Sequence, residues 1–206
     1  MLSLQVRQLT CVRGQKILSR NIHFELSSGD LLLIEGRNGS GKTSLLRQLA
    51  ALSTTETGRI LWRGQDIHTC YPHYWQHLHY LGHSHGIKLG LTIEENLKLM
   101  ASLAEMPISL SCQDAILQQL NLHTYQHTLA ADLSAGQKRR LALARLWLIH
   151  KPLWILDEPL TALDRDSQAL FLHHLDQHLT TGGMCILSSH SSLPVVPLVI
   201  LRLPQW

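Results

Sequence analysis

The sequence lacks any apolar run of roughly 20 residues, the length that a helix needs to cross a bilayer. We therefore expect no transmembrane helix, so a role at a membrane would need a partner that supplies the membrane part. The N-terminal stretch MLSLQVRQLT has no continuous apolar core, and we expect no secretory signal there. Repeats and low-complexity tracts are also absent. A length of 206 residues is typical of one domain, and we predict a single domain over residues 1–206.

The sequence also lacks closely spaced cysteine pairs, and its net charge is small. Cys11, Cys70, Cys112 and Cys185 are far apart and form no C-x-x-C pair. We interpret them as reduced thiols of a cytosolic protein, not as a disulfide framework or a zinc site. The formal net charge is only +3, which is too weak to indicate nucleic acid on its own. We therefore expect no nucleic-acid partner.

Short apolar runs predict a mixed α/β fold. Alternating or β-rich stretches predict strands of an antiparallel or mixed region: LSLQV, IHFEL and GRILW. Continuous apolar runs that end in glycine or polar residues predict buried strands: DLLLIEG, LWILDEP and GMCILSSH. In open α/β sheets, ligands bind beyond the carboxyl ends of such strands.

Helical patterns occupy most of the segment between the predicted strands GRILW and LWILDEP. TIEENLKLMASLAEM begins with Thr92, and Glu95 three residues later predicts a capping box. DAILQQLNL and AGQKRRLALARLWLIH predict two more helices, and a fourth is expected from about 165 to 180. We interpret the chain as an α/β core interrupted by a helical insert from approximately 84 to 150.

The stretch GRNGSGKT matches the pattern G-x-x-x-x-G-K-[ST] between a predicted strand and a predicted helix. Its glycines let successive backbone N–H groups point at a polyphosphate, and the helix dipole adds to the attraction. We expect Lys42 to reach the β- and γ-phosphates and the Thr43 hydroxyl to bind Mg²⁺. The predicted ATP-binding residues are Gly36, Arg37, Asn38, Gly39, Ser40, Gly41, Lys42, Thr43 and Ser44.

Two carboxylates, Asp157 and Glu158, end the apolar run LWILDEP. Alone, such a pair is commonly a solvated strand end. Together with a phosphate-binding loop, it predicts that Asp157 holds Mg²⁺ through water and that Glu158 polarises the water that attacks the γ-phosphate.

The segment LSAGQKRRLALAR resembles the signature of ATP-binding cassette (ABC) ATPases, usually L-S-G-G-Q followed by a basic helix. Ala135 is the one departure within the pentapeptide. LTALD with Asp164 resembles the D-loop of that family, and ILSSH with His190 resembles its switch histidine. The resemblance implies a P-loop NTPase fold: an ABC nucleotide-binding domain with a RecA-like core, an antiparallel β subdomain and a helical insert.

The resemblance also implies how the signature would work. Two such chains form an ATP-dependent homodimer, packed head to tail, in which each ATP lies between the phosphate loop of one chain and the signature of the other. Ser134 and the backbone of Gly136 would then contact the γ-phosphate across the interface, and His190 would also contact the γ-phosphate. The signature residues are Leu133, Ser134, Ala135, Gly136 and Gln137.

A closer resemblance is to the ATP-binding subunits of the cytochrome c biogenesis haem exporter, carried by LGHSHGIKLGLTIEENL and LWILDEP. It implies integral membrane partners, docking on residues 84 to 132, and a peripheral place on the cytoplasmic face of the bacterial inner membrane. The implied task is haem export or release of haem from its chaperone complex. The alternatives are the ATPase subunit of another ABC transporter and a soluble cassette protein that acts on ribosomes or DNA.

Two positions depart from the general cassette pattern. His83 stands where most cassettes carry a Gln that senses Mg²⁺ and the attacking water, and an imidazole could replace that amide in part. We therefore include His83 with Glu158 and His190 among the candidate catalytic residues. The stretch CVRGQK lacks the aromatic residue that usually stacks on adenine, in a loop after the first strand, so Val12 or Arg13 must serve.

The chain contains 14 histidines, which raises the hypothesis of a metal or haem site, with nucleotide as a regulator. On one unbroken strand, four of them would share a face because side chains alternate: His77, His79, His83 and His85. Gly82 and Gly86 argue against such a strand. We therefore expect no haem contact by this chain, and we interpret most of these side chains as solvated or partly packed.

Overall fold

The computed structural model describes residues 2–14, 16–106, 108–189 and 199–203. The chain divides into two compact units. Unit 1 comprises Met1–His83, Lys151–Pro159 and Leu175–Trp206, and unit 2 comprises Ser84–His150 and Leu160–His174. Each unit has its own hydrophobic core.

An antiparallel sheet forms one part of unit 1. Its strand order is β2-β1-β4-β5, made of β1 (Ser3–Arg13), β2 (Lys16–Ser27), β4 (Arg59–Trp62) and β5 (Gln65–Asp66). The three strands predicted from alternation are confirmed, but β1 and β2 run much further than their apolar stretches. Their pairing shifts register near Leu9, and Gln8 and Asn21 have positive φ, so the alternation that marks a strand breaks inside the hairpin.

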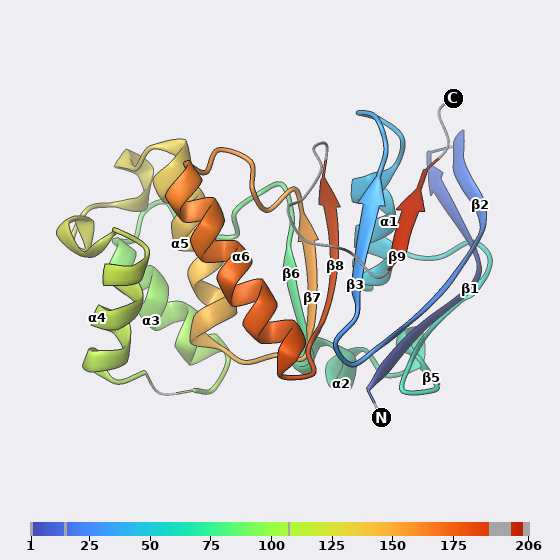
Figure 1. Ribbon diagram of the computed structural model, residues 1–206, viewed down its shortest axis with the longest axis horizontal. Helices are drawn as coiled ribbons and strands as arrows, with labels where there is room; N and C mark the ends of the chain where they lie inside the picture. The colour runs from blue at the N-terminus through green and yellow to red at the C-terminus, as the bar shows by residue number, and fades with distance from the viewer. Residues whose placement is uncertain (1, 15, 107, 190–198, 204–206) are drawn as a thin grey trace. The chain divides into compact units, whose positions relative to one another are not determined.

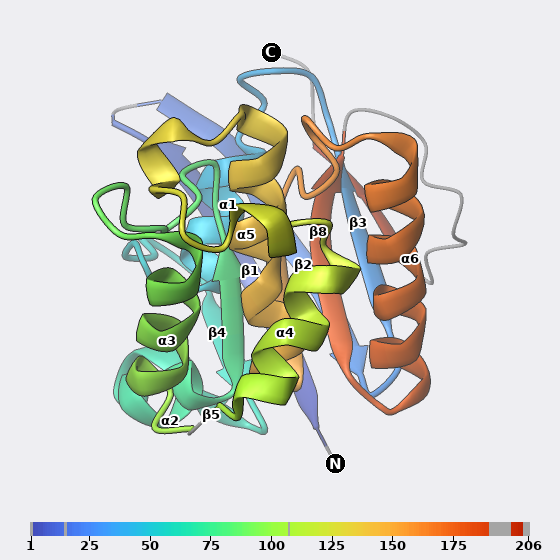
Figure 2. The same cartoon turned by 90° about the vertical axis from the view of Figure 1, so that its left-hand side faces the viewer.

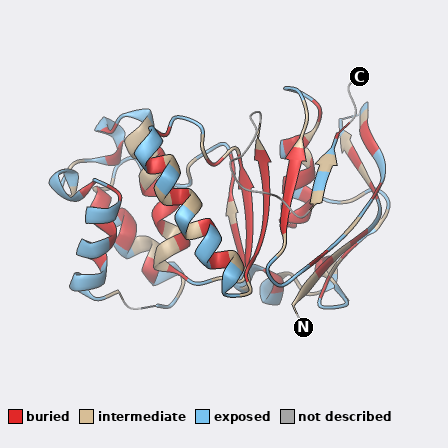
Figure 3. Ribbon diagram, viewed as in Figure 1, coloured by how far each residue is buried: buried red, intermediate tan, exposed pale blue. Residues whose placement is uncertain are grey.

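The second sheet of unit 1 is parallel, in the order β6-β7-β8-β3-β9 (Figure 1). Its strands are β3 (Leu31–Glu35), β6 (Leu78–Leu81), β7 (Leu153–Asp157), β8 (Met184–Ser189) and β9 (Val199–Arg202). The three central strands, β3, β7 and β8, are almost wholly buried, as the red arrows in Figure 3 show. The three predicted buried strands are therefore confirmed, and their carboxyl ends share one edge of the sheet.

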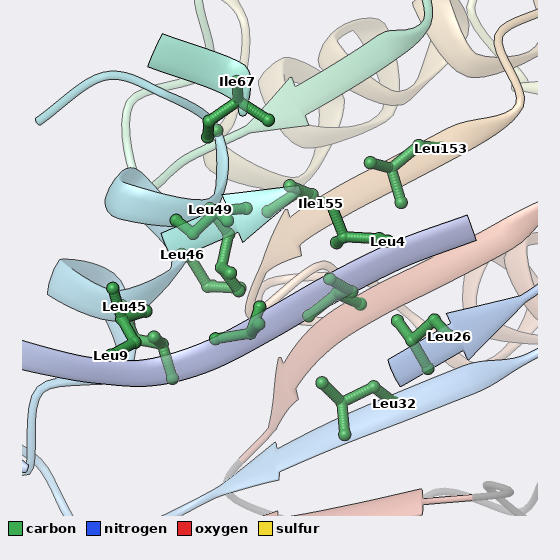
Figure 4. Close-up of a cluster of buried hydrophobic side chains, with 14 of the residues drawn as sticks. Leu4, Leu9, Leu26, Leu32, Leu45, Leu46, Leu49, Ile67, Leu153 and Ile155 are labelled. Carbon is green, nitrogen blue, oxygen red and sulfur yellow. The ribbon is translucent and has the colours of Figure 1, made fainter. Parts of the chain in front are cut away.

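Helix α1 (Lys42–Leu49) packs its leucines into the core of unit 1. Figure 4 shows Leu45, Leu46 and Leu49 among side chains from both sheets, including Leu4 of β1 and Leu32 of β3. All five are completely buried. This packing fixes the start of α1 at the carboxyl end of β3. The short helix α2 (Tyr71–Gln76) and the 3-10 turn η1 (Ile67–Thr69) precede β6.

Unit 2 is helical. It contains α3 (Ile93–Leu103), α4 (Leu110–Gln119), α5 (Ala135–Leu148) and the first turns of α6 (Arg165–Thr180), with α3, α4 and α5 labelled in Figure 2. Short 3-10 turns, η2 (His123–Tyr125) and η3 (Ala130–Asp132), connect α4 to α5. The capping box at Thr92 and Glu95 is confirmed. Helix α4 begins four residues before the predicted start, because Ser109 caps it by accepting the N–H of Cys112.

The histidine-rich stretch does not form one long strand. Strand β6 ends at Leu81, so it contains His79 but not His83 or His85. His79 is buried, and His77 lies at the C-terminal cap of α2. The four histidines therefore do not share a strand face. Within the described ranges, no three His, Cys, Asp or Glu side chains gather closely enough to hold a metal ion. Among the same residues, no helix is long and apolar enough to cross a membrane.

Candidate functional site

The predicted phosphate-binding loop joins β3 to α1 at the carboxyl edge of the parallel sheet. Gly41 precedes the first residue of α1 with φ of 103°, a conformation that L side chains rarely adopt. A Cβ atom at Gly41 would also lie 2.9 Å from a methyl carbon of Leu18. The start of α1 has no capping side chain, so its first N–H groups are available to an anion.

Lys42 is folded back over this loop. Its Nζ donates to the carbonyl oxygens of Gly36, at 2.7 Å, and of Arg37, at 3.4 Å. The side chain is only 5% exposed, and Nζ lies 3.9 Å from Oε1 of Glu158. Burial lowers the pKa of Lys42, and the negative charges of Glu158 and Asp157 oppose that shift. The ammonium is thus desolvated and faces two carboxylates.

Asp157 is held by two hydroxyl groups. Thr43 Oγ1 donates to one carboxylate oxygen at 2.7 Å, and Ser188 Oγ donates to the other at 2.7 Å. Ser188 also accepts the backbone N–H of Glu158 at 3.0 Å. Sequence reasoning missed Ser188, although the polar end of the apolar run GMCILSSH was a signal for it. These bonds hold the Asp157 carboxylate in place beside the phosphate-binding loop, and Asp157 is only 3% exposed.

Glu158 has a strained backbone, with φ of 47° in the left-handed region. Such a conformation costs about 1–3 kcal/mol for a non-glycine residue and is concentrated at functional sites. Its side chain is 25% exposed, so water can reach the carboxylate that faces Lys42.

A cavity of about 130 Å³ begins at the loop and continues to the β1–β2 hairpin. Its walls come from the loop and α1, from Glu158, and from Arg13 and Leu18. Arg13 belongs to the end of β1 and not to a loop after that strand, which corrects the expectation for the stretch CVRGQK. Of the two residues proposed to contact the base, Arg13 lines the cavity.

The signature residues belong to unit 2. Ser134 is the N-cap of α5, where its hydroxyl accepts the N–H of Gln137 and the Gln137 side chain accepts the N–H of Ser134. Leu133 is buried, whereas Ser134 and Ala135 are exposed. Asp164 precedes α6, and its carboxylate accepts the N–H of Ser167 at 2.8 Å. Both segments thus begin helices.

The remaining candidates are placed as follows. His83 is exposed and lies in a bend two residues after β6. His190 falls outside the described residues. The structure therefore brings together Lys42, Thr43, Asp157 and Glu158 within unit 1.

Thr43 and Asp157 suit Mg²⁺ by their chemistry, since the Thr43 hydroxyl and the Asp157 carboxylate bonded to it both offer oxygen ligands. Mg²⁺ is usually held by one or two carboxylates together with substrate phosphates and water, not by a closed protein cage. A hydroxyl and a single buried carboxylate match that pattern.

Comparisons with known proteins find one matching family and several similar chains. Residues 19–161 match the ABC transporter family. The cytochrome c biogenesis ATP-binding export protein CcmA of Mannheimia succiniciproducens is 41% identical over 203 residues, covering 98% of this chain and 94% of that protein. CcmA of Vibrio cholerae is 44% identical over 194 residues, with 92% of each chain covered.

Solved structures share the fold. An ABC transporter ATP-binding protein from Pyrococcus furiosus superimposes with a TM-score of 0.84 at 25% identity, covering 98% of this chain and 97% of that one. A bacterial Atm1-family ABC exporter gives a TM-score of 0.85 at 22% identity, covering 98% of this chain and 37% of that one.

Proposed function

The chain belongs to the ABC transporter family, and from that membership we propose that it is the ATP-binding, ATP-hydrolysing subunit of a membrane complex for cytochrome c biogenesis. The task of the complex would be haem export or release of haem from a chaperone complex. The identity of 41–44% to two CcmA proteins over nearly the whole chain supports the pathway. The observation that carries the ATPase function is the grouping of Lys42, Thr43, Asp157 and Glu158 at one sheet edge.

The phosphate end of ATP would bind at the start of α1. Lys42 would exchange its bonds to the Gly36 and Arg37 carbonyls for phosphate oxygens, with little movement because its ammonium already lies over the loop. That exchange would also separate Lys42 from Glu158. Thr43 and Asp157 would hold Mg²⁺, which when bound neutralises charge on the β- and γ-phosphates.

Glu158 would act as the base that orients and polarises the attacking water. Its strained backbone is anchored through its N–H to Ser188, which also holds Asp157. One serine therefore positions the carboxylate proposed for Mg²⁺ and the carboxylate proposed for water. His190 would contact the γ-phosphate, as the family pattern implies.

The signature would act on the ATP bound by a second copy of the chain. Ser134 and Gly136 lie at the start of α5, where the helix dipole favours an anion. The γ-phosphate would hold the two copies together, and hydrolysis would release them. Membrane subunits would dock on residues 84–132 and place the complex at the cytoplasmic face of the inner membrane.

Glu158→Gln tests the assignment directly. We expect hydrolysis to fall by about a hundredfold or more, the usual contribution of a general base, while ATP binding persists and ATP-dependent dimers accumulate. Lys42→Ala is the comparison variant, because, unlike Glu158→Gln, it is expected to lose affinity for the nucleotide. Turnover is measured by phosphate release, binding by calorimetry and dimers by size-exclusion chromatography with light scattering. Parent-like hydrolysis in Glu158→Gln would refute its role.

A further inference from the structure

We propose that Arg140 is a positioning residue that fastens the signature to the loop carrying Asp164, so that both meet the second copy of the chain as one rigid block. The signature segment is residues 133–137, and the Asp164 loop is residues 160–164. The inference rests on the proposed function, because it concerns how the ATP-dependent dimer is assembled. Arg140 lies on α5 and Asp164 immediately before α6, two helices labelled in Figure 1.

The first contact is an ion pair. Nη1 of Arg140 lies 3.3 Å from one carboxylate oxygen of Asp164 and 3.5 Å from the hydroxyl of Ser167. The other oxygen of Asp164 accepts the N–H of Ser167. A single carboxylate therefore caps α6 with one oxygen and binds α5 with the other. The Arg140 side chain is 15% exposed, so its orientation is restricted by packing.

The second contact lies four residues earlier on the same helix. A Cβ atom at Gly136 would stand 2.9 Å from the carbonyl oxygen of Ala162, so the two backbones approach closely there. Ala162 itself has φ of 65°. Residues i and i+4 share one face of a helix, which places Gly136 and Arg140 side by side against the Asp164 loop. Two contacts along one face resist the rotation that a single contact would allow.

This arrangement explains the pattern of small residues in the signature. Ala135 replaces the usual glycine and is exposed, so its methyl group meets solvent. Gly136 has no such freedom, because any side chain would press on Ala162. The requirement for glycine at position 136 thus includes attachment to the Asp164 loop, in addition to access for a phosphate.

The ion pair is not expected to matter much for overall stability. Asp164 is 62% exposed, and pairs in contact with solvent contribute little to folding. Bonds from Ser167 and the nearby Arg140 charge hold the pKa of Asp164 below its usual range. A loss of Arg140 is therefore expected to loosen the Asp164 loop more than it destabilises unit 2.

The test compares four variants in the Glu158→Gln background: Arg140→Ala, Arg140→Lys, Asp164→Asn, and Arg140→Ala combined with Asp164→Asn. Asp164→Asn keeps an oxygen for the Ser167 N–H and removes the charge. Lys98→Ala is the control, because it removes an exposed ion pair with Glu94 on α3 of the same unit. ATP binding, the ATP concentration that half-saturates dimer formation, and the melting temperature are measured for each.

We expect Arg140→Ala to raise the half-saturating ATP concentration for dimers about tenfold, the size of one lost charge-assisted contact, with ATP affinity of the monomer unchanged. Asp164→Asn is expected to weaken dimers similarly, the double variant to be no worse than either single one, and Arg140→Lys to recover part of the loss. Lys98→Ala is expected to match the parent.

The outcomes separate this inference from the proposed function. A Glu158→Gln parent that never dimerises with ATP would refute the proposed function. A parent that dimerises while Arg140→Ala stays within about twofold of it, or losses that simply add in the double variant, would overturn the role of Arg140 alone. Should Arg140→Ala fail to fold, parent-like dimers of both Arg140→Lys and Asp164→Asn would overturn it.

Discussion

At the residue scale, the site contains charged groups that would be costly to bury without polar or charged partners. The Lys42 ammonium is desolvated, the Asp157 carboxylate is 3% exposed, and each is tolerated because hydroxyls, carbonyls or opposite charges surround it. ATP phosphates would enter this balance as further acceptors for Lys42. The affinity for ATP is therefore expected to depend on Lys42 and Asp157, which are already held at the phosphate-binding loop.

Arg13 provides a test of base recognition. Since Arg13 and Leu18 of the β1–β2 hairpin line the cavity that begins at the phosphate-binding loop, we expect the guanidinium to stack on the base of ATP. Arg13→Ala is expected to weaken ATP binding about tenfold but to leave tripolyphosphate binding unchanged, and Arg13→Tyr to restore ATP binding. Calorimetry with both ligands measures this. Equal losses for ATP and tripolyphosphate would show that Arg13 binds phosphate instead.

His83 provides a second test at this scale. The side chain is exposed just after β6, where a nucleotide-sensing residue is predicted. We expect His83→Gln to keep hydrolysis and His83→Ala to lower it about tenfold, or to uncouple it from haem delivery, because only the first keeps a hydrogen-bonding group. Phosphate release and cytochrome c assembly are measured together. Parent-like behaviour of both variants would make His83 an ordinary surface histidine.

Single residues of the site differ in how well the sequence predicts them. Lys42 and Thr43 follow from a pattern whose spacing is dictated by the phosphates, and Asp157 from its place at a strand end. Ser188 could not be assigned, because its role depends on β8 lying beside β7, which is a long-range pairing. The same limit applies to Arg13, whose position depends on the length of β1.

At the element scale, two helices of unit 2 begin with the same device. Thr92 with Glu95, and Ser134 with Gln137, each form a reciprocal capping box. Both follow from local sequence, since the two residues of each box are three positions apart. The starts of α3 and α5 and the buried strands were therefore predictable, whereas α2, β9 and the register of the long β1–β2 hairpin depend on tertiary contacts.

The paired capping boxes allow a matched experiment. Thr92→Ala and Ser134→Ala each remove one cap and are expected to destabilise the protein by about 1 kcal/mol. Only Ser134 is proposed to contact ATP of the second copy, so Ser134→Ala alone is expected to lower hydrolysis, about tenfold or more. Urea unfolding and phosphate release are measured for both. Equal effects of the two variants on hydrolysis would mean that Ser134 serves only as a cap.

At the scale of the whole molecule, two exposed leucines lie within the segment proposed to dock on a membrane subunit. Leu89 and Leu129 are 53% and 43% exposed within residues 84–132. Their segments are joined, because Ala131 donates its N–H to the Leu89 carbonyl and Thr92 pairs with Leu129. The two leucines thus belong to adjacent backbone segments. We therefore choose Leu89 as the position at which to test the proposed docking.

We expect Leu89→Glu to abolish recovery of multi-span membrane subunits from solubilised membranes, because a carboxylate would be buried without a partner. Hydrolysis by the isolated chain is expected to stay unchanged, since Leu89 is not part of the ATP cavity. Leu52→Glu, at a 44%-exposed leucine of unit 1, is the control and is expected to retain the subunits. Affinity purification with peptide mass spectrometry identifies what is recovered. Retention of the subunits by Leu89→Glu would place docking elsewhere, and failure of the parent chain to recover any multi-span protein would contradict its assignment to a membrane complex.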